Sequence, residues 1–245
     1  MGNIEYSVTK KVARITLDKP PANLFDKDMG ERLYELLQNA EGNQDVSAIY
    51  ITGKGKRFSG GLDLSTVDPS DTQYIEQLQH GVFNPIITQL YNSRKAVICA
   101  MNGSAAGVGL MIGLVSDLTY LKQGARMAFT FADRGLVPAC GATHILPKLV
   151  GEKRALEIIL MREKISAEQA VKEGLINGVY GNEQEILEKV KHIAELSPEL
   201  IALTKRAMKD RTETELITRL LIEEKVQSEA FRLPSFQNGI AKFRK

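Results

Sequence analysis

The sequence has little cysteine, little net charge and no long hydrophobic run, and each absence narrows what the protein can be. Only two cysteines, Cys99 and Cys140, occur in 245 residues. That is too few for a disulfide framework and is typical of a reducing, cytoplasmic setting. The net charge is +2, with both signs interspersed along the chain, so no nucleic-acid partner is expected.

Neither a membrane anchor nor a secretion signal is visible in the sequence. The longest apolar run, at 105–115, is glycine-rich and far below the roughly 20 residues that span a bilayer. The first residues lack the basic region followed by an apolar stretch that marks a secretory signal. We therefore expect a cytoplasmic protein without a membrane partner.

Histidine is also scarce, which bears on metal binding. Cys140 and His144 lie four residues apart and could share a helix face, but a zinc site needs three or four ligands. Only His80 and His192 remain as further histidines, so no metal is expected. A nucleophilic Cys140–His144 pair stays open beside the simpler interpretation of a buried thiol and a packing histidine.

Two glycine-rich loops carry the clearest functional signal. One is Arg-Phe-Ser-Gly-Gly-Leu-Asp-Leu at 57–64, and the other is Asn-Gly-Ser-Ala-Ala-Gly-Val-Gly at 102–109. Each follows a strand-like apolar run and precedes a helix-like segment. Small residues leave backbone N–H groups bare, and a helix N-terminus favours negative charge. Two such loops that meet would present two donors to one oxygen, which makes an oxyanion hole.

Strand-like and helix-like segments alternate along much of the chain. The expected elements are strands at 4–9, 12–17, 47–52 and 96–101, helices at 28–41 and 71–93, and one amphipathic helix from 210 onward. This succession predicts an α/β fold of repeated ββα units with stacked sheets flanked by helices. No Ser/Gly-rich linker interrupts it. We predict one α/β core over 1–195 and a helical C-terminal extension over 196–245.

The two loops and their surroundings resemble the crotonase (enoyl-CoA hydratase/isomerase) superfamily. Further stretches match the family's pattern in the same order: 129–138, 142–151, 154–157, 165–170, 174–177 and 239–243. The resemblance implies a crotonase-like spiral of ββα units, with an extension that mediates trimerisation or forms a lid. It also implies a homotrimer or hexamer. The phenylalanines of the extension, Phe231, Phe236 and Phe243, look too apolar for a solvated tail.

The resemblance assigns roles to residues of both loops. The backbone N–H groups of Leu62 and Val108 would form the oxyanion hole for the thioester oxygen of an acyl-CoA, or of an acyl-carrier thioester. No permanently bound cofactor is implied, because the CoA thioester is the substrate. The residues implied to bind it are Lys56, Arg57, Gly60, Gly61, Asp63, Leu64, Gly107 and Lys245.

The chain departs from the family pattern where proton-transferring acids are expected. A hydratase of this family uses two glutamates, which would fall at Met111 and Phe131, and some isomerases place an acid at Ala139. All three residues are apolar here. Two-glutamate hydration is therefore not expected. The resemblance still implies an enzyme of the enoyl-CoA hydratase/isomerase family, a lyase or isomerase that stabilises a thioester enolate in the oxyanion hole. The alternatives are an enolate-forming decarboxylase, a thioester hydrolase or a binding-only member.

Other titratable residues could replace the missing acids. Asp133 and His144 are the candidates, and Tyr74 and His80 are weaker ones. Asp133 has the opposite strand parity from Phe131, so we expect it to point away from the pocket and to serve a structural role.

Overall fold

The backbone forms two sheets of unequal size. The structure is a computed structural model that describes residues 4–68, 71–208 and 213–241. The larger sheet contains β1 (Ile4–Thr9), β2 (Val12–Leu17), β3 (Ala48–Gly53), β5 (Ala96–Met101), β7 (Leu118–Lys122) and β10 (Gly178–Tyr180), in that order. β1 and β2 pair antiparallel, and all other neighbours in this sheet are parallel. The expected strands at 4–9, 12–17 and 96–101 are confirmed.

The smaller sheet contains the strands that follow β3, β5 and β7 of the larger sheet in the chain. Its strands are β4 (Arg57–Ser59), β6 (Ser104–Ala106), β8 (Arg126–Ala128) and β9 (Lys164–Ser166). The chain runs from β3 to β4, from β5 to β6 and from β7 to β8, and a helical segment follows each pair. The described chain therefore winds as a spiral of ββα units, as expected.

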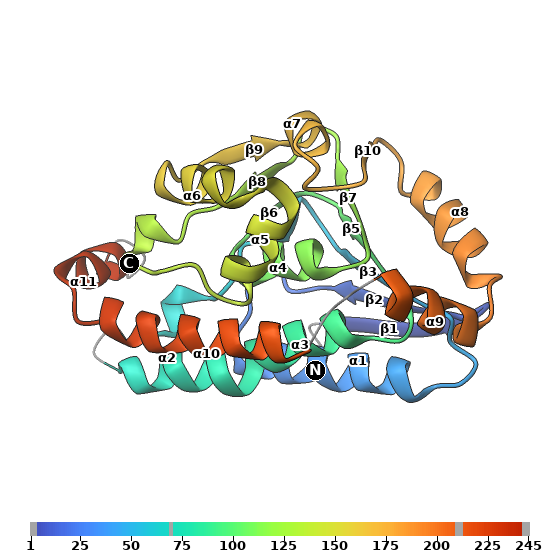
Figure 1. The fold of residues 1–245 in the computed structure, drawn as a ribbon, viewed down its shortest axis with the longest axis horizontal. Coiled ribbons are helices and arrows are strands. Elements are labelled where there is room, and N and C mark those ends of the chain that lie inside the picture. The colour runs from blue at the N-terminus through green and yellow to red at the C-terminus, as the bar shows by residue number, and fades with distance from the viewer. Residues whose placement is uncertain (1–3, 69–70, 209–212, 242–245) are drawn as a thin grey trace.

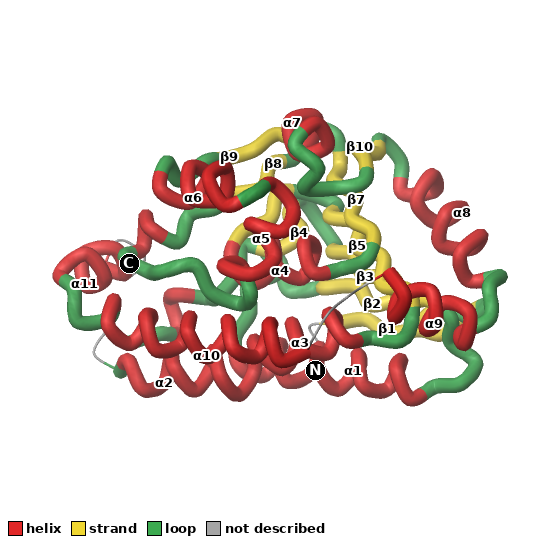
Figure 2. Tube along the Cα trace, in the orientation of Figure 1, coloured by secondary structure: helices red, strands yellow, loops and turns green. Residues whose placement is uncertain are grey.

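Helices enclose both sheets (Figure 1). They are α1 (Lys27–Gly42), α2 (Thr72–Leu78), α3 (Asn84–Asn92), α4 (Gly107–Val115), α5 (Ala142–Val150), α6 (Glu152–Leu160), α7 (Ala167–Lys172), α8 (Glu183–Ala194), α9 (Pro198–Met208), α10 (Glu213–Ala230) and α11 (Pro234–Ala241). Figure 2 shows α1, α2, α3 and α10 side by side in one layer along the bottom of the view. None of the described helices is both long and apolar enough to cross a membrane.

The core follows from the alternation of side chains along buried parallel strands. In β5, Val97 and Cys99 belong to the main cluster, while Ala96 and Ile98 belong to a second cluster on the opposite face. Residues of α8 and α9 complete that second cluster. Both faces of the sheet are therefore covered, which explains the continuous apolar sequence of this strand.

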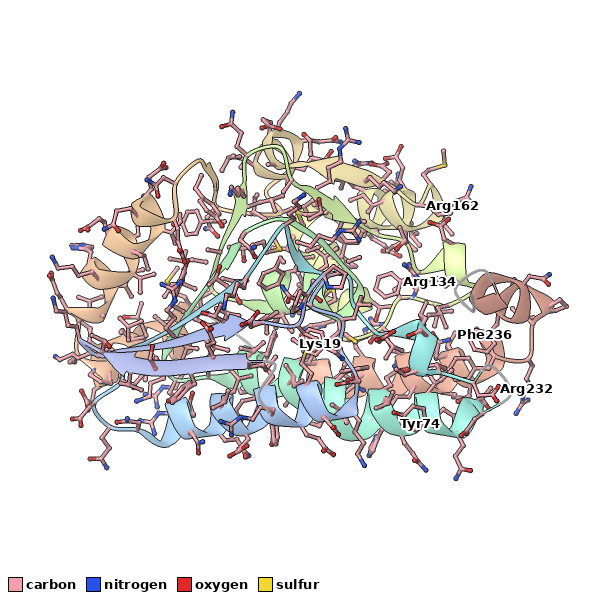
Figure 3. All side chains as sticks on the ribbon, turned by 180° about the vertical axis from the view of Figure 1, so that it is seen from behind. Lys19, Tyr74, Arg134, Arg162, Arg232 and Phe236 are labelled. Carbon is pink, nitrogen blue, oxygen red and sulfur yellow. The ribbon has the colours of Figure 1, made fainter. Side chains whose placement is uncertain are left out.

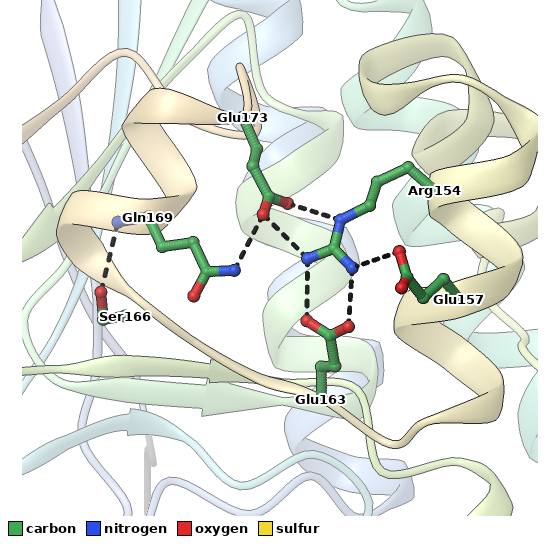
Figure 4. A network of polar contacts seen from close by, with 6 residues as sticks. All are labelled: Arg154, Glu157, Glu163, Ser166, Gln169 and Glu173. Atoms are coloured by element: carbon green, nitrogen blue, oxygen red, sulfur yellow. Dashed lines mark hydrogen bonds and ion pairs between the residues drawn. The ribbon is translucent and has the colours of Figure 1, made fainter.

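Arg154 joins three segments through hydrogen bonds and ion pairs (Figure 4). Arg154 on α6 donates to Glu163, before β9, at 2.6 and 2.8 Å and to Glu173, after α7, at 2.8 and 3.1 Å. Its third partner is Glu157, at 2.9 Å. Paired, charge-assisted hydrogen bonds of this kind fix both distance and orientation. The network therefore holds α6 and α7 against β9.

Several expected helices differ in detail from the observed ones. The segment 71–93 is not one regular helix, because a π-helical stretch, η2 (Gln79–Phe83), separates α2 from α3. The C-terminal segment is divided into α10 and α11, and Pro234 begins α11. Pro fixes φ and lacks an N–H, so it favours the start of a helix over its interior.

The C-terminal phenylalanines turn inward. Phe231 and Phe236 are buried, with ring centroids 4.8 Å apart, in a cluster with Leu64, Val67 and Ile75. The expectation that these side chains are not solvated is therefore confirmed for Phe231 and Phe236. Their cover comes from the same chain, so they give no argument for a partner chain, and Phe243 lies outside the described residues. A β-carbon on Gly239 of α11 would come within 2.5 Å of the Arg134 backbone. In Figure 3, which views the molecule from the side opposite to Figure 1, Phe236 lies beside Arg134.

Candidate active site

The first glycine loop is fastened to the segment that precedes α1. The Gly60 N–H donates to the Ala22 carbonyl at 2.9 Å, and the Ser59 hydroxyl donates to the Asn23 carbonyl at 2.8 Å. The Gly61 N–H then donates to the Ser59 hydroxyl at 3.1 Å. The two contacts of the Ser59 hydroxyl are buried, so they hold the loop in one conformation.

Asn23 fixes the chain that leads into this loop. Its side-chain amide lies 3.0–3.1 Å from the carbonyls of Lys54, Arg57 and Phe58. Asn23 itself has a φ of 48°, in the left-handed region that asparagine tolerates better than most residues. One buried side chain therefore sets the path from β3 through β4.

The two glycine loops touch. A β-carbon on Gly61 would lie 3.0 Å from the Ala106 carbonyl oxygen and 3.2 Å from the Gly107 Cα. Gly61 has a φ of 86° and Gly107 a φ of 53°, both in the region that favours glycine. The backbone conformation thus favours glycine at both positions, and the close approach of the loops is a second reason at Gly61.

The N–H groups of Leu62 and Val108 have no carbonyl partner within the described chain. Around Leu62, Phe25 donates to the Gly61 carbonyl and accepts from the Asp63 N–H, both at 2.8 Å. In parallel pairing of this kind, the N–H of the middle residue, here Leu62, points away from the paired strand. Val108 lies in the first turn of α4, where N–H groups have no intrahelical acceptor.

A cavity of about 90 Å³ is lined by residues of both glycine loops. The first loop contributes Gly60, Leu62 and Leu64 to its wall, and the second contributes Gly107 and Val108. The structure thus brings together residues that the sequence placed at one site. The cavity wall thus carries, from each loop, one residue whose N–H has no carbonyl partner within the described chain.

Other residues assigned to substrate binding lie elsewhere. Lys56 and Arg57 are exposed and do not line the cavity. The Asp63 side chain accepts from the Ser65 N–H at 3.1 Å and so caps the short 3₁₀ helix η1 (Leu64–Thr66). Lys245 lies outside the described residues.

Neither proposed substitute acid lines this cavity. Asp133 belongs to a 3₁₀ helix, η3 (Ala132–Arg134), and pairs with Arg162 at 3.5 Å. Because these residues form a helix and not a strand, strand parity does not apply to Asp133, although Asp133 does lie outside the cavity wall as expected. His144 is buried in α5, with its Nε2 3.3 Å from the Tyr91 hydroxyl.

The positions where the family would place acids are apolar and close to the site. Phe131 and Ala139 line the cavity, whereas Met111 is fully buried in α4. No aspartate or glutamate is among the described residues of the cavity wall. Cys140 does line it, but burial raises the pKa of its thiol. A protonated thiol is a poor nucleophile, which argues against an activated Cys140–His144 pair.

The polar side chains of the cavity wall were not predicted from the sequence. They are Thr130, Arg134 and the side-chain amides of Gln79 and Gln227. Arg134 donates through Nη1 to the Thr130 carbonyl at 2.9 Å and to the Thr130 hydroxyl, and burial lowers the pKa of its guanidinium. Within the described residues, no group of three His, Cys, Asp or Glu side chains could hold a metal ion.

Comparison with known proteins defines the class. The family model described as enoyl-CoA hydratase/isomerase matches residues 7–245. The 1,2-epoxyphenylacetyl-CoA isomerase of Escherichia coli is 31% identical over 96% of this chain and 93% of its own, and a probable enoyl-CoA hydratase of Rhodobacter capsulatus is 30% identical over 98% and 94%. An enoyl-CoA hydratase structure from Bacillus halodurans superposes with a TM-score of 0.91 at 25% identity, over 98% of this chain and 100% of that one.

The fold is therefore that of the crotonase superfamily, as the glycine loops indicated. The chain belongs to the enoyl-CoA hydratase/isomerase family and is an enzyme of that family that processes acyl-CoA.

Proposed function

We propose that the protein binds an acyl-CoA thioester with its carbonyl oxygen between the backbone N–H groups of Leu62 and Val108. These donors stabilise the negative charge that develops on the oxygen as an enolate forms at the α-carbon. The contact between Gly61 and Gly107 carries the proposal, because it brings both N–H groups to one cavity wall. Preorganised donors in a site that excludes water act most strongly on charge that develops during reaction.

The proposed chemistry uses no positioned carboxylate. Phe131 and Ala139 line the cavity at the positions where the family pattern places acidic residues. Rapid hydration of an enoyl-CoA is accordingly not the proposed reaction. Enolate formation by decarboxylation fits the apolar wall, because loss of carbon dioxide generates the enolate without a base. Hydrolysis of the thioester is the alternative: water adds to the carbonyl carbon, the C–S bond breaks, and the proton that the water loses ends on the departing thiol of CoA.

The test compares two ligands that differ only at the carbonyl. Butyryl-CoA carries the thioester oxygen, whereas S-butyl-CoA has a methylene in its place. Calorimetry with the full chain should give about tenfold or tighter binding for butyryl-CoA, because S-butyl-CoA leaves two buried N–H groups without an acceptor. Equal affinities would contradict the oxyanion hole, and absence of binding by both would contradict the acyl-CoA site.

A substrate panel then separates the reactions. Malonyl-CoA reports decarboxylation through release of carbon dioxide, and butyryl-CoA reports hydrolysis through release of free thiol. Binding of these thioesters without either product would identify a binding-only member.

A further inference from the structure

The loop 136–141 contributes to the cavity wall and is held by α10 at two points. Its residues in the wall are Leu136, Val137, Ala139 and Cys140. The Val137 N–H donates to Gln227 Oε1 at 3.1 Å. The Gly141 N–H donates to Glu223 Oε2 at 2.9 Å. Glu223 and Gln227 lie four residues apart on one face of the helix, and each is 2% exposed. A buried face of α10 therefore fixes this part of the wall.

The backbone is strained where this loop ends. Cys140 has a φ of 60°, in the left-handed region that residues with a β-carbon rarely adopt. Such a conformation persists only where surrounding contacts maintain it. Glu223 supplies contacts directly after Cys140, because its carboxylate accepts from the N–H and the hydroxyl of Thr143, at 2.9 and 2.7 Å, as well as from Gly141. One buried side chain thus holds the turn that follows the strained residue.

The strength of this hold depends on the ionisation of Glu223. Hydrogen bonds to an ionised carboxylate are roughly twice as strong as those to a neutral group, and a protonated carboxyl group carries an O–H that must itself donate. Burial raises the pKa of Glu223 to about 7, so both forms are populated near neutral pH. Protonation therefore weakens the contacts that hold the turn after Cys140.

Other titratable groups surround Glu223. The neighbouring carboxylate of Glu224 raises the pKa of Glu223 further, and Glu224 contacts His80 of η2 at 3.1 Å. Burial raises the pKa of the Cys140 thiol, which therefore stays protonated. The elements packed against α10 also carry Tyr74, Glu76, Tyr91, His144 and Lys148. Because histidines ordinarily titrate near neutral pH, a test must separate the effect of His80 from that of Glu223.

We infer that Glu223 is a positioning residue of the acyl site: its carboxylate holds the Cys140–Gly141 turn and, through it, the wall against which the acyl group packs. This inference rests on the proposed acyl-CoA site. Glu223 is not among the described residues of the cavity wall, so it acts through the loop and not on the substrate. Loss of its charge loosens the wall around the acyl group and leaves the binding of the CoA portion unchanged.

Two ligands separate the acyl group from the rest of the substrate. Butyryl-CoA carries an acyl group, whereas free CoA does not, and both share the phosphates whose titration would otherwise confuse a pH series. Calorimetry with the full chain gives the ratio of the two affinities. The preference for butyryl-CoA should rise about tenfold between about pH 5.5 and about pH 8.5, because ionised Glu223 holds the wall more firmly. The midpoint should lie at about 7, the pKa of Glu223.

Substitutions assign this dependence to Glu223. Glu223→Gln brings an NH₂ group toward the donors of Gly141 and Thr143, so the preference should be low at every pH. Thr143→Val removes the hydroxyl, whose hydrogen bond lowers the pKa of Glu223, and should move the midpoint to higher pH. Glu229→Gln makes the same change as Glu223→Gln at an exposed position of α10. It is the matched control and should retain the wild-type curve, and all three variants keep His80.

The outcomes separate the inference from the function on which it rests. If the wild-type protein shows no preference for butyryl-CoA at any pH, the acyl site itself is wrong. A preference that is the same at every pH would leave the site standing and overturn the inference. A wild-type pH curve in Glu223→Gln, with a melting temperature that shows a folded variant, would overturn it as well. Should Glu223→Gln fail to fold, Thr143→Val decides, and an unmoved midpoint overturns the inference.

Discussion

Glu223 accepts a hydrogen bond from the backbone N–H of Gly141 at 2.9 Å, although the two residues lie far apart in the chain. The other carboxylate oxygen accepts from the N–H and the hydroxyl of Thr143, at 2.9 and 2.7 Å. The carboxyl group of α10 thus caps the first turn of α5, next to the cavity residue Cys140. Burial nevertheless raises the pKa of Glu223 from 4.5 to about 7.

Stability should therefore depend on pH through Glu223. Because its pKa is raised in the folded state, the folded protein holds the proton more tightly than the unfolded chain. The resulting stabilisation is complete below about pH 4.5 and is lost as the pH rises through about 7. Melting temperatures should fall from about pH 5 to about pH 8 more steeply for the wild type than for Glu223→Gln. Parallel curves would contradict the raised pKa.

Gly61→Ala should abolish most activity. The new β-carbon would meet the Ala106 carbonyl at 3.0 Å and the Gly107 Cα at 3.2 Å, which moves the Leu62 N–H out of line. Loss of one oxyanion donor typically lowers kcat by about 10²–10³-fold. Gly55→Ala is the matched control, because Gly55 also has a positive φ of 84° but nothing within 4 Å. Equal turnover by the two variants would argue against the site.

Hydration of crotonyl-CoA should be very slow. A positioned acid or base contributes about 10²–10⁴-fold to proton transfer, and no carboxylate lines the described cavity. Loss of the conjugated enoyl absorbance measures the rate in the wild-type protein. Turnover above about 1 per second would show that another residue supplies the proton.

Phe131→Glu with Met111→Glu should raise that hydration rate if the backbone holds the family geometry. Phe131 already borders the cavity, whereas Met111 is 0% exposed. A glutamate at the second position would therefore lower stability more, because burying a charge without a partner is costly. Comparing the melting temperatures of the two single variants measures this difference.

Lys56 and Arg57 should contribute to binding of the nucleotide end of CoA. Both are exposed, whereas nearby Lys54 is held by Glu5 at 3.0 Å and Asp18 at 2.9 Å. Replacing Lys56 and Arg57 by Ala should weaken binding of a CoA thioester and make the remaining affinity less sensitive to salt. Binding of the matching pantetheine thioester, which lacks the nucleotide, should not change. Equal losses for both ligands would contradict this role.

The protein should assemble as a trimer or hexamer. The buried Phe231 and Phe236 no longer support this, but α10 exposes Ile217, Leu221 and Ile222. Contiguous exposed apolar side chains mark association surfaces. Analytical ultracentrifugation at micromolar concentration checks the prediction, and Leu221→Glu should lower the measured mass. A wild-type monomer would contradict it.

Local sequence patterns predicted single elements and the pairing of neighbouring strands. β-rich runs bounded by turn residues identified β1 and β2 as a hairpin-like pair, which their antiparallel register confirms. Continuous hydrophobicity identified β5, because every residue of that strand is buried. The division of consecutive strands between two sheets depends on contacts between distant segments, which periodicity does not encode. Periodicity also gave no sign of the η2 stretch inside the expected helix at 71–93, since Ile75 and Phe83 keep helical spacing across it.

The position of the two glycine loops at the site could be predicted because the proposed donors are backbone N–H groups, which glycine-rich segments leave accessible. Small residues at Gly61 and Gly107 reveal a close approach in the sequence itself. The amides were missed, although Gln227 carried a signal: with Leu216, Leu220 and Glu223 it continues one buried face of α10. A polar residue that interrupts such a face is worth marking as a cavity candidate.

The position of Gln227 also bears on how the protein is made. The other described residues of the cavity wall lie between Gly60 and Cys140, whereas Gln227 comes from α10. During synthesis, the apolar wall therefore leaves the ribosome well before the helix that closes it. Until α10 docks, the nascent chain presents an open hydrophobic surface of the kind that chaperones recognise. Only a chain synthesised through α10 can have the complete cavity.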